Sequence, residues 1–301
     1  IAEVGIVATE LATNLAKHAD QGVLLLRSAP TGDPHAMIEI LAIDSGPGMA
    51  EPDRAWQDGR STAGSLGIGL GAVARLADWH SVLSEPDRGS VFVARLRGDD
   101  RKGVAQAAGN VAGLTRAVGA ETVCGDSYAV RRVADRLSVM MCDGSGHGPL
   151  AAAASQRAVR VFCDDEPRPA EIAVARIHAA LEGTRGGAVA VADHDPATGI
   201  VRYAGIGNIS GSLVTDGRRQ GMVSLPGIAG YRARPVQVFE YPVLAGTLMV
   251  MHSDGLTDRW SLDGRQRVMA AAPVLVAGTL LRDAGVRRDD ASVVVARLGT
   301  T

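Results

Sequence analysis

This sequence has few aromatic side chains and no excess of positive charge. Phe, Trp and Tyr make up only 3% of its 301 residues, and Asp and Glu outnumber Lys and Arg by 33 to 31. Proteins that bind nucleic acid need a basic surface for the phosphates and often aromatic rings on which bases stack. The formal net charge of −2 therefore argues against nucleic acid as a partner.

Long apolar runs and paired cysteines are absent as well. No stretch approaches the roughly 20 apolar residues that a helix needs to cross a bilayer, so we expect no membrane role. The first residues lack the basic segment of a secretory signal peptide. Cys124, Cys142 and Cys163 are too widely spaced for a CxxC site, and their odd number disfavours a disulfide framework. These features predict reduced thiols in a cytoplasmic protein.

The length and the pattern of turns predict two domains. A polar, turn-rich segment at residues 98–103 separates two regions, so we predict domains over 1–98 and 104–298. In the first region we expect a helix at 1–20, strands at 23–26 and 37–43 joined through 29–34, a helix at 72–79 and a strand at 91–96.

Short apolar strands dominate the second region. We expect them at 138–142, 188–192, 201–204, 212–214, 236–239, 247–251 and 292–298. Helical stretches at 149–162, 168–181 and 270–281 interrupt them. Strands and helices in blocks favour α+β layers over a doubly wound sheet.

Polar side chains on the first helix form a stripe. Glu10, Asn14 and Lys17 are spaced i, i+4 and i+7, so a carboxylate, an amide and an ammonium face the same side. A surface helix is the commoner explanation for any one of them. Together they fit a helix that lines a ligand cleft.

Two glycine-rich segments follow that helix. Asp44 ends a strand and precedes Gly46 and Gly48, which would let a flat ring approach the backbone while the carboxylate accepts a hydrogen bond from an exocyclic amine. Later, three alternate glycines open a helix whose N–H groups and dipole suit phosphates; they are Gly67, Gly69 and Gly71. Each segment alone is usually just a turn or loop, but their order favours a nucleotide site.

Two other nucleotide-binding folds do not fit. A Rossmann fold needs a strand before its glycines, and residues 58–62 are polar. A P-loop needs Gly-Lys-Ser/Thr, which is missing.

Residues 1–97 instead resemble the GHKL ATPase family, and residues 58–73 look most like the short lid of the RsbT-type switch kinases. The resemblance implies a Bergerat α/β sandwich that binds ATP with Mg²⁺. By it, Asn14 holds Mg²⁺, Glu10 acts as a base or orients the attacking hydroxyl, Asp44 binds adenine and the three alternate glycines cradle phosphates. Such domains usually begin with a further strand and helix, so we expect a partly truncated form here.

Four aspartate positions in the second region stand at expected strand ends or turns. They are Asp126, Asp143, Asp254 and the pair Asp289–Asp290. Clustered carboxylates repel one another unless a cation compensates or their pKa values rise. Oxygen ligands without clustered His or Cys favour Mg²⁺ or Mn²⁺ over zinc, and two such ions can activate water against a phosphoryl group.

A single Asp-Gly is usually only a turn. Here apolar strands deliver both Asp143 and Asp254 into Asp-Gly loops, and the residues after Asp143 lack the alternating ligands and terminal Glu of an EF-hand. His147 and His252 are single histidines, which are more often structural, so we leave them out of the metal site.

Five motifs in family order resemble the SpoIIE/RsbX branch of the metal-dependent protein phosphatases (PPM). They are residues 125–128, 143–148, 205–208, 253–258 and 289–292. The resemblance spans about 104–298 and implies an α-β-β-α sandwich. By it, Asp143 bridges two metals, Gly144 contributes its carbonyl, and Asp254 and Asp289 complete one shell. Asp126 is a nearby or water-mediated ligand, and Asp289 is favoured over Asp290 by motif position.

The sequence thus predicts a partner-switching regulator. Its second domain would be a Mn²⁺- or Mg²⁺-dependent serine/threonine phosphatase, with Asp143 and Asp254 as catalytic residues, acting on a STAS-domain phosphoprotein (RsbS/RsbR-like) in a sigma-factor pathway. Its first domain would be an ATP-dependent serine kinase with Glu10 as catalytic residue. Two alternatives remain open: the first domain sequesters a STAS protein or a sigma factor, or it senses ATP and gates the phosphatase.

Overall fold

Contacts divide the chain into two units. The computed structural model describes residues 2–28, 37–56, 69–97, 109–164, 166–231 and 235–299. One unit comprises Ile1–Gly109 and Val274–Arg282, and the other comprises Asn110–Pro273 and Asp283–Thr301. The mixed α+β class predicted from the sequence is confirmed. Among the described helices, none is both long and apolar enough to cross a membrane.

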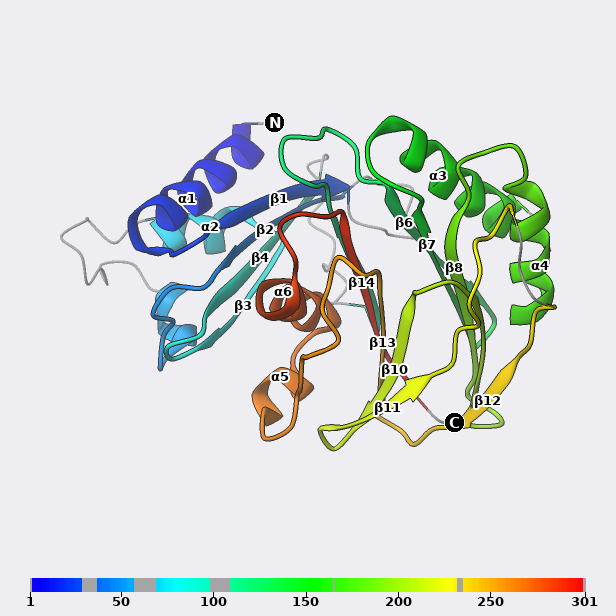
Figure 1. The fold of residues 1–301 in the computed structure, drawn as a ribbon. Coiled ribbons are helices and arrows are strands. Elements are labelled where there is room, and N and C mark those ends of the chain that lie inside the picture. Colours follow the sequence, from blue (N-terminus) through cyan, green and yellow to red (C-terminus); the bar gives the residue numbers. More distant parts are fainter. Residues whose placement is uncertain are drawn as a thin grey trace. The chain divides into compact units, whose positions relative to one another are not determined.

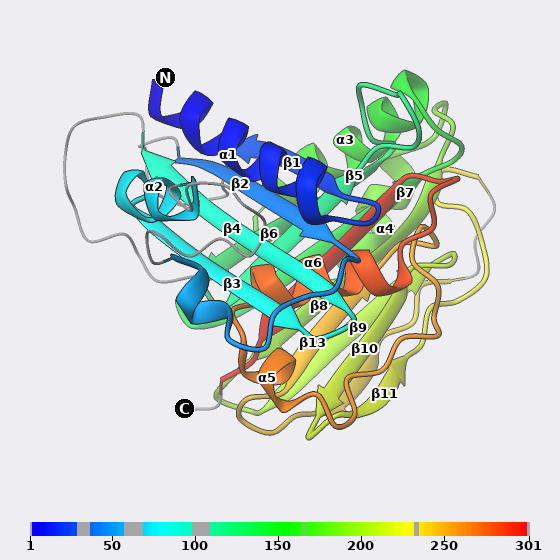
Figure 2. The same cartoon turned by 90° about the vertical axis from the view of Figure 1, so that its left-hand side faces the viewer.

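The first unit is a four-stranded antiparallel sheet in the order β1-β2-β4-β3. Its elements are α1 (Ala2–His18), β1 (Val23–Ser28), β2 (Met37–Asp44), the 3-10 helix η1 (Pro52–Trp56), α2 (Gly69–Leu76), β3 (Trp79–Glu85) and β4 (Gly89–Arg97). Helices α1 and α2 lie across one face of this sheet (Figure 2), where Val7, Leu11 and Val73 pack against Ile40 and Phe92. The apolar stripe of α1 is thus its buried face.

The opposite face of this sheet contacts helix α6 (Pro273–Ala284), most of which groups with the first unit. A β-carbon placed on Gly278 would lie 2.7 Å from Val91 Cγ1, and Arg282 forms an ion pair of 3.5 Å with Glu85. Successive side chains of a strand point to opposite faces, so Val91 lies on the other side of β4 from Phe92. From the predicted domain boundary near residue 100, the helix expected at 270–281 should belong to the second domain. In the structure, residues 274–282 group with the first unit instead.

The predicted helices and strands of the first unit agree only in part with the observed ones. Helix α2 begins three residues before the predicted 72–79, and strand β3 was not predicted at all. The expected connection at 29–34 and residues 58–68 of the expected lid at 58–73, which include Gly67, lie outside the described residues.

The second unit is a sandwich of two five-stranded antiparallel sheets (Figure 1). One has the order β11-β10-β13-β14-β5 and the other β12-β9-β8-β7-β6. The strands are β5 (Val111–Arg116), β6 (Asp126–Val133), β7 (Arg136–Gly144), β8 (Gly187–Asp195), β9 (Ile200–Ile206), β10 (Ser210–Thr215), β11 (Arg218–Met222), β12 (Phe239–Pro242), β13 (Leu248–His252) and β14 (Ala291–Arg297).

Apolar side chains of both sheets meet in one core. Val139 and Tyr203 from one sheet pack with Leu213, Met249 and Val294 from the other. Helices α3 (Pro149–Asp164) and α4 (Ala170–Ala180) cover the outer face of the β12-β9-β8-β7-β6 sheet and form a second core with it (Figure 1), and α5 (Gln266–Ala270) follows β13. The rigid sandwich fixes where its strand ends, and therefore its loops, lie.

Candidate metal centre

Antiparallel pairing brings the predicted carboxylates to strand ends. Strand β7 ends where its neighbour β6 begins, and in their register Asp143 lies directly opposite Asp126. In the other sheet, β13 ends at His252 just before Asp254, and its neighbour β14 begins just after Asp289. Adjacent antiparallel strands start and finish at the same edge. Four segments far apart in the sequence therefore deliver their aspartates in pairs.

Three of these aspartates line one cavity of about 580 Å³, namely Asp143, Asp254 and Asp289. The other residues that line it are mostly small: Ser145, Gly146, Gly187, Ala188, Gly207, Asn208, Ser224, Pro226, Gly227 and Ile228. Gly144, whose carbonyl was the predicted metal ligand, is the last residue of β7, next to Asp143.

Asp143 is buried close to three other carboxylates. Burial, followed by the neighbouring carboxylates of Asp126, Asp254 and Asp289, raises the pKa of Asp143 to about 9. No cationic side chain is among the main influences on that pKa. A carboxyl group in this position holds a proton at neutral pH unless a metal cation replaces it.

Asp126 is buried and held by hydroxyl groups. Ser253 Oγ donates a hydrogen bond of 2.6 Å to Asp126 Oδ2. Burial raises the pKa of Asp126 to about 6, and hydrogen bonds from Ser253 and Ser292 oppose the rise. Asp126 is not among the residues that line the cavity, and its role as a nearby or water-mediated ligand stays a prediction.

The adjacent Asp289 and Asp290 have different surroundings. Both oxygens of Asp290 accept backbone hydrogen bonds of 2.8 Å, Oδ1 from Val118 N and Oδ2 from Gly125 N. Asp290 is only 3% exposed, whereas Asp289 faces the cavity. Burial and the nearby Asp254 raise the pKa of Asp289. Asp290 therefore ties three chain segments together, whereas Asp289 lines the cavity and accepts a backbone hydrogen bond of 2.9 Å at Oδ1 from Asp290 N.

The side chain of Asn208 is hydrogen bonded to the Asp254 carboxylate. Its Nδ2 donates a hydrogen bond of 2.8 Å to Asp254 Oδ2. That contact leaves Asp254 Oδ1 for another partner and limits rotation of the carboxylate. The sequence motif 205–208 contained Asn208, but its contact with Asp254 required the fold.

The two histidines near the motifs have structural partners. His252 Nδ1 lies 2.8 Å from Ser253 O, and His252 Nε2 accepts a hydrogen bond of 3.1 Å from Trp260 Nε1. Arg219 lies over the Trp260 ring at 4.2 Å. His147 Nδ1 lies 3.2 Å from Glu121 Oε1. Both histidines thus have partners within the fold, and their exclusion from the metal site stays a prediction.

The donor set fits a hard divalent cation. In the part of the chain that the structure describes, no three His, Cys, Asp or Glu side chains lie close enough to enclose a single ion by themselves. A site with one bridging carboxylate, a backbone carbonyl and water ligands has no need of three, because Mg²⁺ commonly keeps several waters. The unneutralised charge around Asp143 is what such an ion would compensate.

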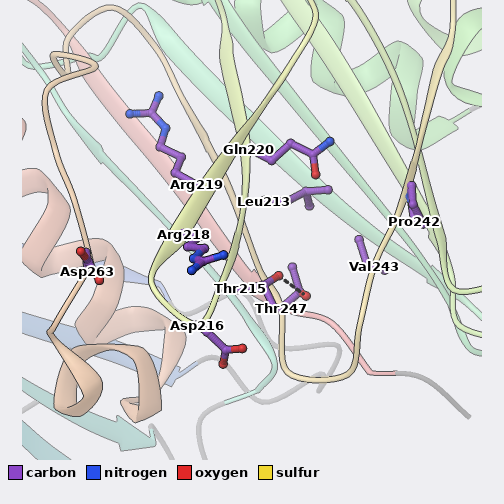
Figure 3. A pocket seen from close by; sticks show the side chains of 10 residues that line it. All are labelled: Leu213, Thr215, Asp216, Arg218, Arg219, Gln220, Pro242, Val243, Thr247 and Asp263. Carbon is purple, nitrogen blue, oxygen red and sulfur yellow. Dashed lines mark hydrogen bonds between the residues drawn. The ribbon is translucent and has the colours of Figure 1, made fainter.

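A second and larger cavity of about 710 Å³ lies on the β10–β11 hairpin (Figure 3). Its carboxylates are Asp216 on the hairpin and Asp263 on a neighbouring loop, and the Thr215 and Thr247 hydroxyls are hydrogen bonded to each other at 2.8 Å. None of the predicted metal ligands lines it. Size alone therefore does not identify the chemical site.

In the first unit, the structure brings Glu10 to the start of α2. A β-carbon on Gly69 would lie 2.5 Å from Glu10 Oε2. Asn14, one turn further along α1, has a buried Nδ2 with no hydrogen-bond partner among the described residues. Lys17 is exposed in the last turn of α1, and Gly71 is buried within α2. Glu10 thus lies near Gly69, and Asn14 is one helical turn away from Glu10.

The predicted adenine-binding segment is compact. Gly46 N donates a hydrogen bond of 2.8 Å to Asp44 Oδ1, and burial raises the pKa of Asp44. A β-carbon on Gly46 would lie 2.8 Å from His18 O at the end of α1. Gly48 has φ +65, and a β-carbon there would lie 2.0 Å from Glu85 O. The middle of α1, at Glu10, therefore lies near Gly69, and its end, at His18, lies near Gly46, with Asn14 between these two positions of the helix.

Two packed antiparallel sheets with helices outside and carboxylates at their strand ends define the PP2C class of phosphatase folds. A solved PP2C phosphatase domain with a fragment of the regulatory domain of SpoIIE from Bacillus subtilis matches 100% of this chain and 88% of its own length, with 18% identity and a TM-score of 0.52. RsbX in complex with magnesium matches 63% of this chain and 94% of its own length, with 19% identity and a TM-score of 0.55. The model of the family "Stage II sporulation protein E (SpoIIE)" matches residues 134–299, more than half of the 301 residues, and the chain belongs to this family.

Two further similarities concern signalling systems. A structure described as the bacterial stressosome, a modular system adapted to control secondary messenger signalling, is 28% identical, covers 62% of this chain and 98% of its own, and has a TM-score of 0.57. The serine/threonine-protein kinase RsbT of Bacillus subtilis strain 168 is 33% identical over 93 residues, which is 31% of this chain and 69% of that protein.

Proposed function

We propose that the second unit is a metal-dependent serine/threonine phosphoprotein phosphatase that hydrolyses its substrate without a covalent enzyme intermediate. The observation that carries the proposal is the position of Asp143: it is opposite Asp126 and shares a cavity with Asp254 and Asp289. Membership of the SpoIIE family supports this reading of the cavity.

Each residue has a defined task in this proposal. Asp143 and the Gly144 carbonyl would hold Mn²⁺ or Mg²⁺, with Asp254 and Asp289 completing the ligand set. When bound, a pair of such ions polarises phosphoryl oxygens and lowers the pKa of a bound water. Ser253 keeps Asp126 in place, and Asn208 fixes the Asp254 carboxylate. Outer contacts of this kind orient metal ligands and tune their affinity.

We further propose a phosphorylated STAS-domain protein as the substrate. The similarity to a stressosome structure at 28% identity supports a partner of this kind. The three cysteines are free thiols, which fits action in a reducing compartment such as the cytoplasm.

For the first unit, we propose binding of ATP with Mg²⁺ and transfer of phosphate to a serine of the same kind of partner. The favouring observation is the buried Nδ2 of Asn14, which has no hydrogen-bond partner among the described residues. Its side chain would hold the Mg²⁺ of the nucleotide through its oxygen, one helical turn from Glu10, which lies near Gly69. The similarity to RsbT over 93 residues supports a switch-kinase origin. Sequestration of a STAS protein or sigma factor, or sensing of ATP to gate the phosphatase, are the competing roles.

The phosphatase proposal is tested by phosphate release from a phosphoserine-bearing STAS protein in the presence of Mn²⁺. We expect Asp143→Asn and Asp254→Asn to lose activity while keeping their circular dichroism spectra. Asp216→Asn is the matched control, since it removes a carboxylate of the second cavity and should retain full activity. Equal activity in Asp143→Asn and the control would refute the site.

The kinase proposal is tested with radiolabelled ATP and an unphosphorylated STAS protein. We expect label transfer that Asn14→Ala abolishes without changing the phosphatase rate. ATP binding that alters only the phosphatase rate would favour the sensor role. Stable binding of the partner with no label transfer would favour sequestration.

A further inference from the structure

An arginine of the turn between α4 and β8 lies at the edge of the metal cavity. A β-carbon placed on Gly146 would lie 3.1 Å from Arg185 Nη1. Gly146 and Ser145 line the cavity together with Asp143. The guanidinium group of Arg185 therefore reaches over the loop that carries the proposed bridging ligand.

The backbone around Arg185 is fixed to that same loop. Ser145 N donates a hydrogen bond of 3.0 Å to Gly186 O, and Gly187 pairs with Gly144 in the β7–β8 register. Gly186 has φ +67, and a β-carbon there would lie 2.4 Å from Ala229 O, so the turn requires glycine next to Arg185.

Thr184 closes the turn from the other side. Its Oγ1 donates to Leu181 O over 2.6 Å and accepts from Gly186 N over 3.0 Å. Tyr231 also donates a hydrogen bond of 3.2 Å to Thr184 O. The base of the Arg185 side chain is thus held in place although the side chain itself is exposed.

The guanidinium group is uncommitted. Arg185 forms no ion pair and no side-chain hydrogen bond with any residue that the structure describes. His147, which follows Gly146 in the same loop, contacts the Glu121 carboxylate instead. The Arg185 guanidinium group, whose backbone is held in place, is therefore available to bind an anionic ligand.

We propose that Arg185 binds the phosphoryl group of the substrate at the metal cavity. This inference rests on the proposed phosphatase function and adds a specific residue to it. Its planar fork can donate two parallel hydrogen bonds to phosphate oxygens, which a point charge does not do. Arg185 would hold the phosphoryl group over the Asp143 loop and offset part of its charge, while hydrolysis itself depends on the metal ligands.

The test compares Arg185→Ala, Arg185→Lys and the wild-type chain loaded with Mn²⁺. Steady-state hydrolysis of p-nitrophenyl phosphate and of a phosphoserine protein gives kcat and KM, and inorganic phosphate serves as a competitive inhibitor. We expect Arg185→Ala to lower kcat/KM and to weaken phosphate inhibition by about ten- to a hundredfold, the range of a charge-assisted hydrogen bond. Arg185→Lys should fall between, and Mn²⁺ affinity should stay the same in all three.

The control is Arg157→Ala, which removes an exposed arginine of α3 and should behave as wild type. An unchanged inhibition constant for phosphate in Arg185→Ala would overturn the inference while leaving the phosphatase proposal intact. A loss of Mn²⁺ affinity equal to the loss of activity would also overturn it, because Arg185 would then act on the metal site. A wild-type chain without phosphatase activity would overturn both proposals.

Discussion

The hydroxyl group of Ser253 donates a hydrogen bond of 2.6 Å to Asp126, 127 positions away in the sequence. The same oxygen accepts a hydrogen bond of 3.0 Å from Ser292 N. One buried serine therefore joins the start of β6, the loop before Asp254 and the start of β14. The two sheets of the sandwich are linked at the point where the proposed metal ligands emerge.

Ser253→Ala should weaken both the fold and the metal site. It leaves the Asp126 carboxylate and Ser292 N–H without their buried partner, which costs about 1–3 kcal/mol of unfolding free energy. The pKa of Asp126, already near 6, should rise further because a hydrogen bond to its ionised form is lost. Urea denaturation and Mn²⁺ titration measure the two effects. Ser261→Ala, at an exposed serine, is the control, and equal stability of the two variants would contradict the expectation.

Substitutions at the adjacent Asp289 and Asp290 should have opposite signatures. Asp290→Asn keeps one acceptor oxygen for two backbone N–H groups, so unfolding free energy should fall by about 1–2 kcal/mol. Asp289→Asn should leave stability nearly unchanged and weaken Mn²⁺ binding. Denaturation curves and Mn²⁺ titrations of both variants decide the matter. The reverse pattern would assign the metal ligand to Asp290.

The stability of the metal-free chain should depend on pH because the pKa of Asp143 is raised in the folded state. Its pKa is about 9 in the folded chain, against an ordinary value of 3.8. Between these values the folded state binds a proton that the unfolded state has lost, so raising the pH through this window removes stability. Asp143→Asn should therefore be more stable than the metal-free wild type by about 1–3 kcal/mol at pH 8, with a smaller gain at pH 5.

Thermal unfolding in EDTA at both pH values checks this expectation. Asp216→Asn provides the comparison for removal of a carboxylate elsewhere. A gain in Asp143→Asn that does not vary with pH would speak against burial and neighbouring charge as its origin. Addition of Mn²⁺ should reverse the order by stabilising the wild type more than Asp143→Asn.

Asn208→Ala should reduce metal affinity without unfolding the chain. The variant removes the hydrogen bond of 2.8 Å that restrains Asp254. Loss of such an outer contact typically weakens metal binding about 10- to 100-fold. Isothermal titration with Mn²⁺ gives the affinity, and Asn110→Ala, at an exposed asparagine, is the control. Identical Mn²⁺ affinity in the two variants would show that Asp254 needs no such restraint.

Much of the second unit could be predicted because its signals are local. Apolar strands ending in Asp-Gly predicted where Asp143 and Asp254 emerge, and the structure places both in one cavity. Strand β6 was not predicted, since two adjacent arginines, Arg131 and Arg132, interrupt its apolar alternation. Its tertiary pairing with β7 outweighs that local pattern.

Contacts that depend on distant segments could not be read from the sequence. A lone arginine in a turn carries no motif, so nothing pointed to Arg185. Asp290 accepts hydrogen bonds from the backbone N–H groups of Val118 and Gly125, and nothing in the sequence indicates that these residues lie near it. Helix α6 has an amphipathic pattern that indicates burial but not its partner, and its contact with Val91 appears only in the fold.

The proposal that Asp143 and its neighbours hold divalent ions is tested most directly by equilibrium binding of Mn²⁺ to the metal-free chain at pH 8, followed by electron paramagnetic resonance. We predict saturation at two ions per wild-type chain and loss of at least one of them in Asp143→Asn. Equal stoichiometry and affinity in the wild type and Asp143→Asn would contradict a metal site at these carboxylates.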